Sequence, residues 1–276
     1  NLTVKYDKDI TSKEFIELCA STALVTAKPS FANHKMDVED FGTENYALAS
    51  CYNGFIIGGG GYTLVRLVLS RLAESSGSVE DFLDNKLPFA AKKMLEYIDE
   101  RIKFLVEEAA FFKSNFLVKE GFINRDLFTG MFGLVGLAEA VNHLLNATEQ
   151  KDRFGHSKEA NDLGLKIIEK LNSIVSSYKS IYVNCFGGNH VLHAQVGIDS
   201  DTGISPGCRI PVGEEPELFE HILQSAPYHK YFFNGIGDIF VFEDTYKNNP
   251  EAIVNVIDGA FNSGIRYTSA FPLSSS

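Results

Sequence analysis

Residues 47–73 read ALASCYNGFIIGGGGYTLVRLVLSRLA, a stretch that places one cysteine, Cys51, shortly before four consecutive glycines, Gly58 to Gly61. The run from Ala47 to Ile57 predicts an extended, buried segment that enters a loop. Tyr62 to Ala73 is apolar at helical spacing and predicts a helix. Because glycine lets the backbone turn tightly, the stretch predicts a constrained loop that carries one thiol.

The glycine run lacks the patterns of the common nucleotide-binding loops. A phosphate-binding loop needs Gly-Lys followed by Ser or Thr at a fixed distance from its first glycine, and no lysine follows here. The dinucleotide fingerprint needs a third glycine at a fixed step after Gly58-x-Gly60, and position 63 is Thr. We therefore expect these glycines to form a tight loop whose backbone lies against other backbone or a ligand.

Three roles are open for Cys51. Free cysteine is among the most buried residue types, so the simplest role is a small apolar side chain in the core. A thiolate nucleophile would need a nearby histidine, and His190 and His193 are remote in the sequence. The third role is a thiyl radical, since a thiol can lose a hydrogen atom and then take one from a substrate. Such a thiol must lie at the tip of a constrained loop in a dry cavity, which suits this stretch.

The composition is that of a folded globular chain. Its 276 residues are 45% hydrophobic and include 22 Phe and 11 Tyr, enough to bury a sizeable core. A net charge of -11 argues against nucleic acid as a partner, because phosphate binding needs basic patches. No apolar run reaches the length of a membrane span, and the 4 cysteines form no Cys-x-x-Cys pair. The sequence therefore indicates a cytoplasmic protein with free thiols, no structural zinc and no membrane contact.

Helices alternate with short strands along the chain, which predicts α/β architecture. The apolar seam from Ile98 to Phe116 and the capped segment from Ser157 to Tyr178 predict two of the helices. Further helices are expected at Phe15–Lys28, Phe132–Asn146, Leu218–Gln224 and Pro250–Phe261, and strands at Ser180–Cys185, His190–Val196 and Asp238–Phe242.

Three blocks of the sequence resemble the glycyl radical enzymes, the family of pyruvate formate-lyase and anaerobic ribonucleotide reductase. Residues 47–73 are similar to the family's cysteine loop, with Val65 to Arg71 where lyase-type members carry Ala-Arg-x-Asn-Leu-Ala-Lys. Residues 197–216, GIDSDTGISPGCRIPVGEEP, resemble the block Tyr-Gly-x-x-Thr-Gly-x-x-Pro-Asp-Gly-Arg-x-x-Gly-x-Pro. Residues 128–145, FTGMFGLVGLAEAVNHLL, resemble a helix that opens Gly-Leu-x-Gly-Leu. The resemblance rests on the order and spacing of these three blocks.

The resemblance implies a fold as well as a family. Glycyl radical enzymes have an α/β barrel of about ten strands, made of two half-barrels, and the cysteine loop enters the centre of the barrel. The chain would then be a single unit over 1–276 and part of a larger barrel, with the cysteine loop at about 47–61 and the second half-barrel at about 62–276. It would be a C-terminal portion of a protein from an uncharacterised branch.

The resemblance also implies chemistry and partners. In the family, a separate radical S-adenosylmethionine activase installs a glycyl radical that oxidises the cysteine, so Cys51 would be the thiyl residue. Arg66 would hold a substrate carboxylate, as the matching arginine does in lyase-type relatives, because guanidinium pairs with carboxylate bidentately. A surface arginine or an ion pair on a helix is the alternative for Arg66. Tyr52 and Asn53 would bind substrate or pack the loop. Members are commonly homodimers, and no directly bound cofactor or metal is expected.

Three departures from the family pattern restrict the expected reaction. The radical glycine motif Arg-Val-x-Gly-Tyr is not in the sequence, so it either follows Ser276 in a longer protein or the chain cannot be activated. Position 50 is Ser, where formate-lyases have a second cysteine. Position 53 is Asn, where dehydratases have a glutamate base. The substrate therefore does not follow from the resemblance.

The remaining polar clusters favour structural interpretations. Cys185, His190 and His193 give the spacing Cys-x4-His-x2-His, but a fourth ligand is not evident and a strand would alternate their faces, so no metal site is predicted. Thr202 and Arg209 are expected to stabilise a glycine- and proline-containing turn, in which Cys208 is incidental.

The leading hypothesis is an enzyme of anaerobic bacterial metabolism, similar to a lyase or acyltransferase of the pyruvate formate-lyase type. Thiyl-mediated hydrogen abstraction would cleave a bond in a small anionic carboxylate. One alternative is a family relative that has lost its active centre and acts as a scaffold or binding subunit. Another is a Cys–His nucleophilic hydrolase, which requires a histidine within hydrogen-bond reach of Cys51.

Overall fold

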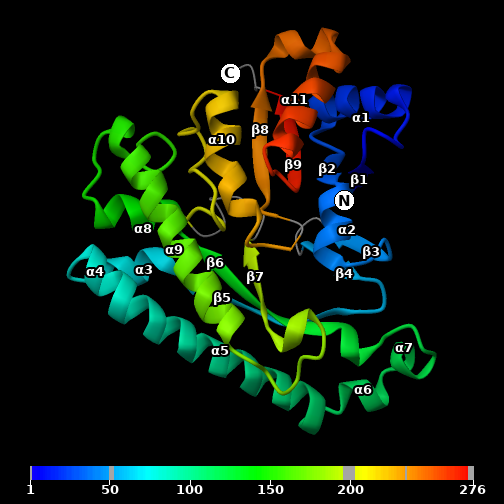
Figure 1. Cartoon of the computed structure of the whole chain (residues 1–276), viewed down its shortest axis with the longest axis vertical. Helices are drawn as coiled ribbons and strands as arrows, with labels where there is room; N and C mark the ends of the chain where they lie inside the picture. The colour runs from blue at the N-terminus through cyan, green and yellow to red at the C-terminus, as the bar shows by residue number, and fades with distance from the viewer. Residues whose placement is uncertain (1, 50–52, 195–202, 234, 273–276) are drawn as a thin grey trace.

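The computed structural model of the chain describes residues 2–49, 53–194, 203–233 and 235–272. Helices and short strands alternate, and the strands form a four-stranded, a three-stranded and a two-stranded sheet (Figure 1). The α/β architecture predicted from the sequence is therefore confirmed. Within the described ranges, no helix is both long and apolar enough to cross a bilayer.

The longer helices are α1 (Lys13–Thr26), α2 (His34–Phe41), α5 (Leu87–Lys103), α8 (Leu137–Leu144), α9 (Lys158–Ser177), α10 (Leu218–His229) and α11 (Pro250–Asn262). The shorter ones are α3 (Leu69–Glu74), α4 (Val79–Asp81), α6 (Phe111–Ser114) and α7 (Phe116–Lys119). The strands are β1 (Thr3–Tyr6), β2 (Ser30–Asn33), β3 (Tyr46–Ala49), β4 (Asn53–Ile56), β5 (Gly60–Val68), β6 (Phe128–Val135), β7 (Val191–Ala194), β8 (Asp238–Phe242) and β9 (Tyr267–Pro272).

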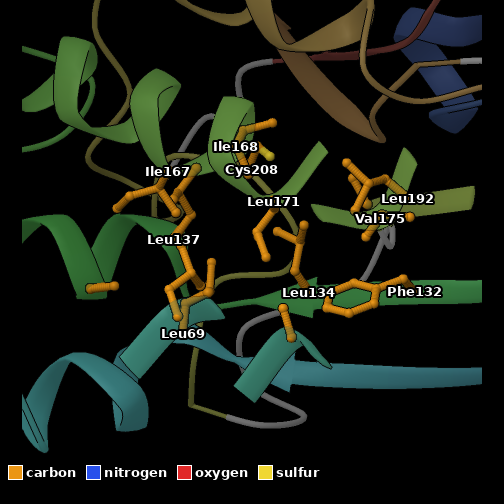
Figure 2. Close-up of a cluster of buried hydrophobic side chains, with 14 of the residues drawn as sticks. Leu69, Phe132, Leu134, Leu137, Ile167, Ile168, Leu171, Val175, Leu192 and Cys208 are labelled. Atoms are coloured by element: carbon orange, nitrogen blue, oxygen red, sulfur yellow. The ribbon is translucent and has the colours of Figure 1, made fainter. Parts of the chain in front are cut away.

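The three-stranded sheet is parallel throughout, in the order β5-β6-β7. Its side chains alternate between two faces, and Phe132 and Leu134 of β6 point to the face that α5 and α9 cover. Figure 2 shows these two side chains in one apolar cluster with Leu192 of β7 and with Leu171 and Val175 of α9. All five are buried. The packing of this face, called the outer face below, therefore holds the sheet against α5 and α9.

Two predicted helices are wrong at their N-terminal ends, because both segments begin as strands. Gly60–Val68 is β5, where a helix was expected over Tyr62–Ala73, and Phe128–Val135 is β6, where a helix was expected over Phe132–Asn146. Strands of a parallel sheet are packed on both faces, so they read as almost continuous apolar runs. Periodicity alone does not separate such a run from a buried helix.

The four-stranded sheet joins the two ends of the described chain. Its order is β1-β2-β9-β8, in which β1–β2 and β9–β8 are parallel and β2–β9 is antiparallel. The hydroxyl oxygens of Ser30 and Ser269 lie 2.8 Å apart across the antiparallel pair. A second apolar cluster, with Phe31, Leu24 and Ile257 buried, lies between this sheet and α1, α10 and α11. One antiparallel pair thus joins two parallel pairs in this sheet.

The helices with capping signals agree best with their predictions. α9 begins after Ser157, whose hydroxyl accepts a hydrogen bond from the N–H of Ala160. α1 begins at Lys13, two positions before the expected start at Phe15, because the hydroxyl of Ser12 caps it by accepting a hydrogen bond from the N–H of Phe15. α11 lies in the expected place, and α10 begins at the expected Leu218 but continues beyond the expected end at Gln224 to His229. The strand predicted at Ser180–Cys185 is wrong, since these residues form turns.

The long seam from Ile98 to Phe116 is helical only in its first part. α5 ends at Lys103, a π-helical turn follows, and Ala110 has a φ of 50° in the left-handed region. Phe112, beyond this break, packs against the same apolar cluster as Ile98. The apolar seam therefore continues across a break in the helix.

The glycine run makes the tight connection between β4 and β5. Gly58 has a φ of 90°, which favours glycine, and its carbonyl accepts a hydrogen bond of 2.8 Å from the N–H of Asn124. A Cβ added to Gly59 would overlap the backbone oxygen of Leu127 and would lie 2.8 Å from its Cβ. The connection thus lies directly against the chain that enters β6, as the sequence predicts for backbone packed on backbone.

Gly59→Ala is expected to lower the free energy of unfolding by about 3 kcal/mol, because the backbone of Leu127 cannot move aside as a flexible side chain would. Urea unfolding of the full-length protein measures the change. Gly77→Ala is the matched control, since a Cβ at Gly77 meets no atom within 4 Å. We expect the control to change stability by less than about 1 kcal/mol. Equal losses in the two variants would contradict the close approach at Gly59.

Candidate active site

The two strands of the hairpin β3–β4 lie on either side of the predicted catalytic cysteine in the sequence. Its two strands pair antiparallel, and the pairing ends where Ala49 faces Asn53. Cys51 and Tyr52 fall between these strands in sequence and lie outside the described residues. Asn53 is the first residue of β4. The roles of Cys51, Tyr52 and Asn53 therefore stay predictions.

The hairpin approaches the face of the β5-β6-β7 sheet opposite α5 and α9, called the inner face below. Met131 of β6 is the register partner of Leu64 on this face. It is buried but belongs to neither of the two apolar clusters under the helices. A Cβ built on Gly61 would meet the Met131 side chain and would lie 3.5 Å from the ring of Phe55 in β4. Phe55 therefore reaches the inner face beside Met131.

Arg66 lies in β5 rather than on the predicted helix. It is the exposed residue of that strand, and its register partner on β6 is Gly133. A Cβ built on Gly133 would lie 2.8 Å from the Leu64 side chain and 3.1 Å from Cγ of Arg66, so the arginine stem passes over the glycine. Within the described part of the chain, the Arg66 guanidinium has no hydrogen-bonded or ion-paired partner. The ion pair considered as its alternative role is not found there.

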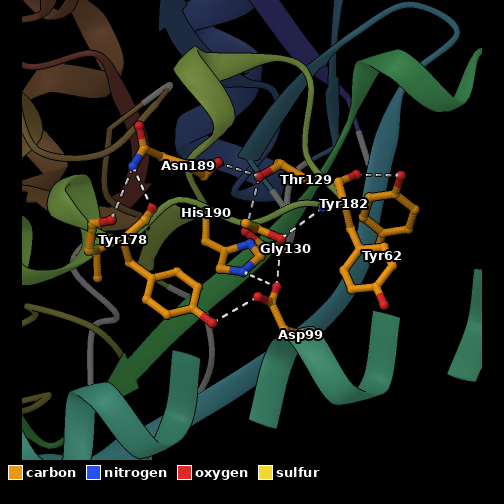
Figure 3. A network of polar contacts seen from close by, with 10 residues as sticks. Tyr62, Asp99, Thr129, Gly130, Tyr178, Tyr182, Asn189 and His190 are labelled. Atoms are coloured by element: carbon orange, nitrogen blue, oxygen red, sulfur yellow. Dashed lines mark hydrogen bonds and ion pairs between the residues drawn. The ribbon is translucent and has the colours of Figure 1, made fainter. Parts of the chain in front are cut away.

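His190 belongs to a polar network on the outer face (Figure 3). Its Nε2 lies 2.9 Å from Oδ1 of Asp99 on α5. Tyr178 and Ser180 donate hydrogen bonds of 2.8 and 2.6 Å to the same carboxylate. Burial lowers the pKa of His190, and Asp99 offsets that effect only in part. The network ties α5, the segment after α9 and the entry to β7 together, so it has a structural role.

His193 lies on the opposite face from His190. It alternates along β7 with Leu192 and Ala194, which belong to the outer-face cluster, so its side chain is directed to the inner face. Cys185 donates a hydrogen bond to the carbonyl of Phe128 at 3.4 Å, and burial raises the pKa of its thiol to about 11. The Cys185, His190 and His193 set therefore does not converge on one point. Across the described residues, no group of three or more His, Cys, Asp and Glu side chains could hold a metal ion.

A buried charge cluster lies between β8 and α10, and no local pattern along the chain identifies its partners. Nε2 of His221 is 3.1 Å from Oδ2 of Asp238, and both residues and Arg209 are at most 4% exposed. Burial opposes ionisation of Asp238, but attraction to His221 and Arg209 outweighs it and holds the pKa of Asp238 below its usual range. Burial also opposes protonation of His221, and Asp238 outweighs it and raises the pKa of His221. Arg209 thus stabilises more than the predicted turn.

Cys208, beside Arg209, is part of the apolar core under α9 (Figure 2). It is 3% exposed, and burial raises the pKa of its thiol well above the ordinary value. This thiol has a packing role, in agreement with its interpretation as incidental to catalysis. Thr202 lies outside the described residues.

Solved structures of glycyl radical enzymes share this fold. The chain aligns with a glycyl radical enzyme from Archaeoglobus fulgidus at a TM-score of 0.74 and 12% identity, covering 99% of this chain and 47% of that one. It aligns with the anaerobic ribonucleotide reductase from Thermotoga maritima, in complex with dATP and CTP, at 0.72 and 12%, covering 98% and 46%. The glycerol-bound B12-independent glycerol dehydratase from Clostridium butyricum gives 0.68 and 15%, covering 99% and 46%. The chain therefore has the glycyl radical enzyme barrel fold, over about half of each neighbour.

Two curated bacterial proteins are similar in sequence. An uncharacterised protein of Haemophilus influenzae is 46% identical over 274 residues, which are 98% of this chain and 53% of the relative. The uncharacterised protein YjjI of Escherichia coli K12 is 40% identical over 266 residues, 96% of this chain and 51% of the relative. The chain thus spans about half the length of these relatives. The sequence model described as "Glycyl radical enzyme YjjI-like" matches residues 1–276, and the chain belongs to this family of glycyl radical enzymes.

Proposed function

We propose that the protein containing this chain is a glycyl radical enzyme that cleaves a bond in a small carboxylate, with Cys51 as the hydrogen-abstracting residue and Arg66 as the carboxylate ligand. The main support for the proposal is the position of the Arg66 guanidinium. It has no partner among the described residues, and it lies on the face of the parallel sheet that the Cys51 hairpin approaches. A guanidinium left without a counter-ion in such a place matches the shape and charge of a carboxylate.

The surroundings of Arg66 suit radical chemistry. On the inner face, Met131 and Val135 are 6% and 7% exposed and give the wall a low polarity. An apolar wall of this kind strengthens the attraction between a guanidinium and a carboxylate. We therefore propose that the substrate lies between this wall and the hairpin.

The proposed role of Cys51 is hydrogen-atom transfer in both directions. A glycyl radical, installed by a radical S-adenosylmethionine activase, would supply the oxidant for the thiol. The sulfur radical of Cys51 takes a hydrogen atom from a substrate carbon, which leaves a thiol and a carbon radical. The bond next to that carbon then breaks, and the product radical takes the hydrogen atom back from the thiol. Arg66 holds the carboxylate throughout, so that the same carbon stays against the sulfur.

The proposal includes partners that follow from the family. The activase is one, and a second copy of the protein in a homodimer is another. The reaction is placed among lyases and acyltransferases of anaerobic metabolism. Because Asn53 stands where dehydratases have a glutamate base, we favour cleavage without a carboxylate base at that position.

Arg66→Lys is expected to raise KM for the carboxylate substrate by about tenfold or more, because an ammonium cannot reproduce the bidentate pairing of a guanidinium. The measurement is turnover of a panel of short carboxylates by full-length protein after anaerobic activation. Arg71→Lys is the control, since Arg71 pairs with Glu74 at 2.9 Å on an exposed helix, and its KM should not change. Turnover with an unchanged KM in the Arg66 variant would remove the clamp, and no turnover of any carboxylate would overturn the proposed function.

A further inference from the structure

The outward side of α5 carries large apolar side chains that the described residues leave uncovered. Phe89, Tyr97 and Phe104 are 68%, 51% and 58% exposed. Their spacing of eight and seven positions puts them on one stripe of the helix, within about 80° of one another. The stripe lies away from the side of α5 that packs on the sheet, and α5 forms a border of the molecule (Figure 1). Aromatic side chains gathered on an exposed helix face are typical of a protein interface.

The charges along this stripe lie on either side of its central tyrosine. Lys93 precedes Tyr97, Glu100 follows it, and both charged residues are exposed. Lys93 pairs within the helix with Glu96 at 2.8 Å, an exposed pair that contributes little. Among the described residues, Glu100 has no hydrogen bond or ion pair. The set called the α5 stripe below consists of Phe89, Lys93, Tyr97, Glu100 and Phe104.

The order of residues in the α5 stripe is complementary to itself when a second α5 lies antiparallel to the first. A two-fold axis places residue i of one copy against residue j of the other, and j against i. With the axis beside Tyr97, Phe89 faces Phe104 of the second copy and Lys93 faces Glu100, because both pairs are centred on that point. A parallel pair would place Lys93 against Lys93 and Glu100 against Glu100, and like charges in contact oppose association.

The surface on both sides of α5 is hollowed. A groove of about 510 Å³ lies between α5 and β5 and is lined by Tyr62, Leu105 and the two C-terminal aromatic residues of the α5 stripe. A second groove, of about 770 Å³, lies between α5 and the segment that follows α9. Helices pack when ridges of side chains on one enter grooves beside the other. α5 is thus a ridge between two grooves, a shape that two copies of the same helix can interlock.

We infer that the α5 stripe is the two-fold interface of the homodimer, with a second copy of this chain as its occupant. The self-complementary order of charges favours a second copy over another segment of the longer protein, because covering by an unrelated segment requires no such symmetry. The inference rests on the proposed function for the homodimer itself and adds the face through which the copies meet. It is independent of the radical reaction, since α5 covers the outer face and the Cys51 hairpin approaches the inner one.

The test is the dimer dissociation constant of the full-length protein, measured by sedimentation with fluorescence detection. Lys93→Glu places like charges together on both sides of the axis and is expected to raise the constant by about tenfold. Glu100→Lys should raise it equally. An equimolar mixture of the two variants should form a heterodimer as tight as the wild-type dimer, because each contact then joins a carboxylate of one chain to an ammonium of the other.

The aromatic contacts are tested in the same way. Phe104→Ala should raise the dissociation constant by about 30-fold or more, since the two-fold axis removes two rings from the interface at once. Phe219→Ala is the matched control, because this phenylalanine is 63% exposed on α10. Lys158→Glu is the matched charge control, because this lysine forms an exposed ion pair on α9. Both controls should leave the constant within about twofold of the wild type.

The outcomes separate this inference from the proposed function. Recovery in the mixture supports the two-fold contact and shows that both variants are folded, since the same chains are present. The inference alone is overturned if the α5 variants dimerise as the wild type does, or if the mixture is no tighter than its separate components. A monomeric wild type would overturn the homodimer as well. Turnover after activation tests the radical function independently of all these results.

Discussion

Activated full-length protein carrying Cys51→Ala is expected to keep its glycyl radical signal and to lose turnover by a factor of at least about 10⁴, because alanine has no hydrogen atom that can be removed and returned at comparable cost. The radical is read by anaerobic electron paramagnetic resonance as a doublet, and turnover is measured on the same sample. Retention of the doublet matters, because it separates loss of hydrogen transfer from failure of activation. Binding of the substrate carboxylate should also persist, since Arg66 is unchanged.

Cys185→Ala is the matched control for that experiment. Cys185 is a half-buried thiol on the outer face with a raised pKa, and its Sγ donates only to the carbonyl of Phe128. Its loss should leave both the doublet and the rate within about twofold of the wild type. Full turnover by Cys51→Ala would exclude the thiyl role. Absence of the doublet in the wild-type protein after activation would favour the alternative of an inactive relative that serves as a scaffold.

Asp238→Asn is expected to lower the free energy of unfolding by about 3–5 kcal/mol, because it removes the buried carboxylate that compensates the charges of His221 and Arg209. Urea unfolding of the full-length protein measures this change in the free energy of unfolding. The control is Asp84→Asn, which removes an exposed ion pair with Lys170 at 3.4 Å and should cost less than about 1 kcal/mol. A loss for Asp238→Asn no larger than that of the control would show that this buried pair does not stabilise the fold.

The effect of Asp238→Asn should depend on pH in a direction that the pKa shifts determine. His221 has a raised pKa in the folded protein, so its contribution is complete below its unfolded pKa of about 6.5 and is lost as pH rises through the folded value. Asp238 has a lowered pKa, so its contribution is present above about 3.8 and is lost as pH falls. The difference between wild type and variant should therefore be largest between about pH 4 and 6.5.

Elements with local signals can be predicted from this sequence. α9 has a serine cap and an amphipathic pattern, and α11 has Asn249 as its cap with Pro250 at its first position. The family resemblance, carried by the cysteine loop and two further blocks, is confirmed by the family match and by the shared fold. Short-range patterns thus predict the ends of helices and the type of barrel.

Features that depend on pairing between distant segments cannot be predicted in the same way. The sequences of β5 and β6 resemble those of helices, because a strand packed on both faces has no alternation of apolar and polar residues to detect. Asp238 opens a strand that is otherwise apolar, which marks it as unusual, but its partners on α10 and near Arg209 are apparent only in the fold. The alignment of Arg66 with Gly133 and His193 likewise arises from strand register, which the spacing of residues along the chain does not reveal.

The antiparallel pairing of β2 with β9 has a consequence for synthesis. Ser30 and Ser269 meet across it although they are 239 positions apart in the chain. A ribosome must release almost all of these residues before β2 can pair with β9, so this pairing forms late and slowly. Until then the edge of the nascent β1–β2 ribbon is open to the wrong strands, including those of other chains. We therefore expect a strong dependence on chaperones during expression, relieved by slower translation at lower temperature.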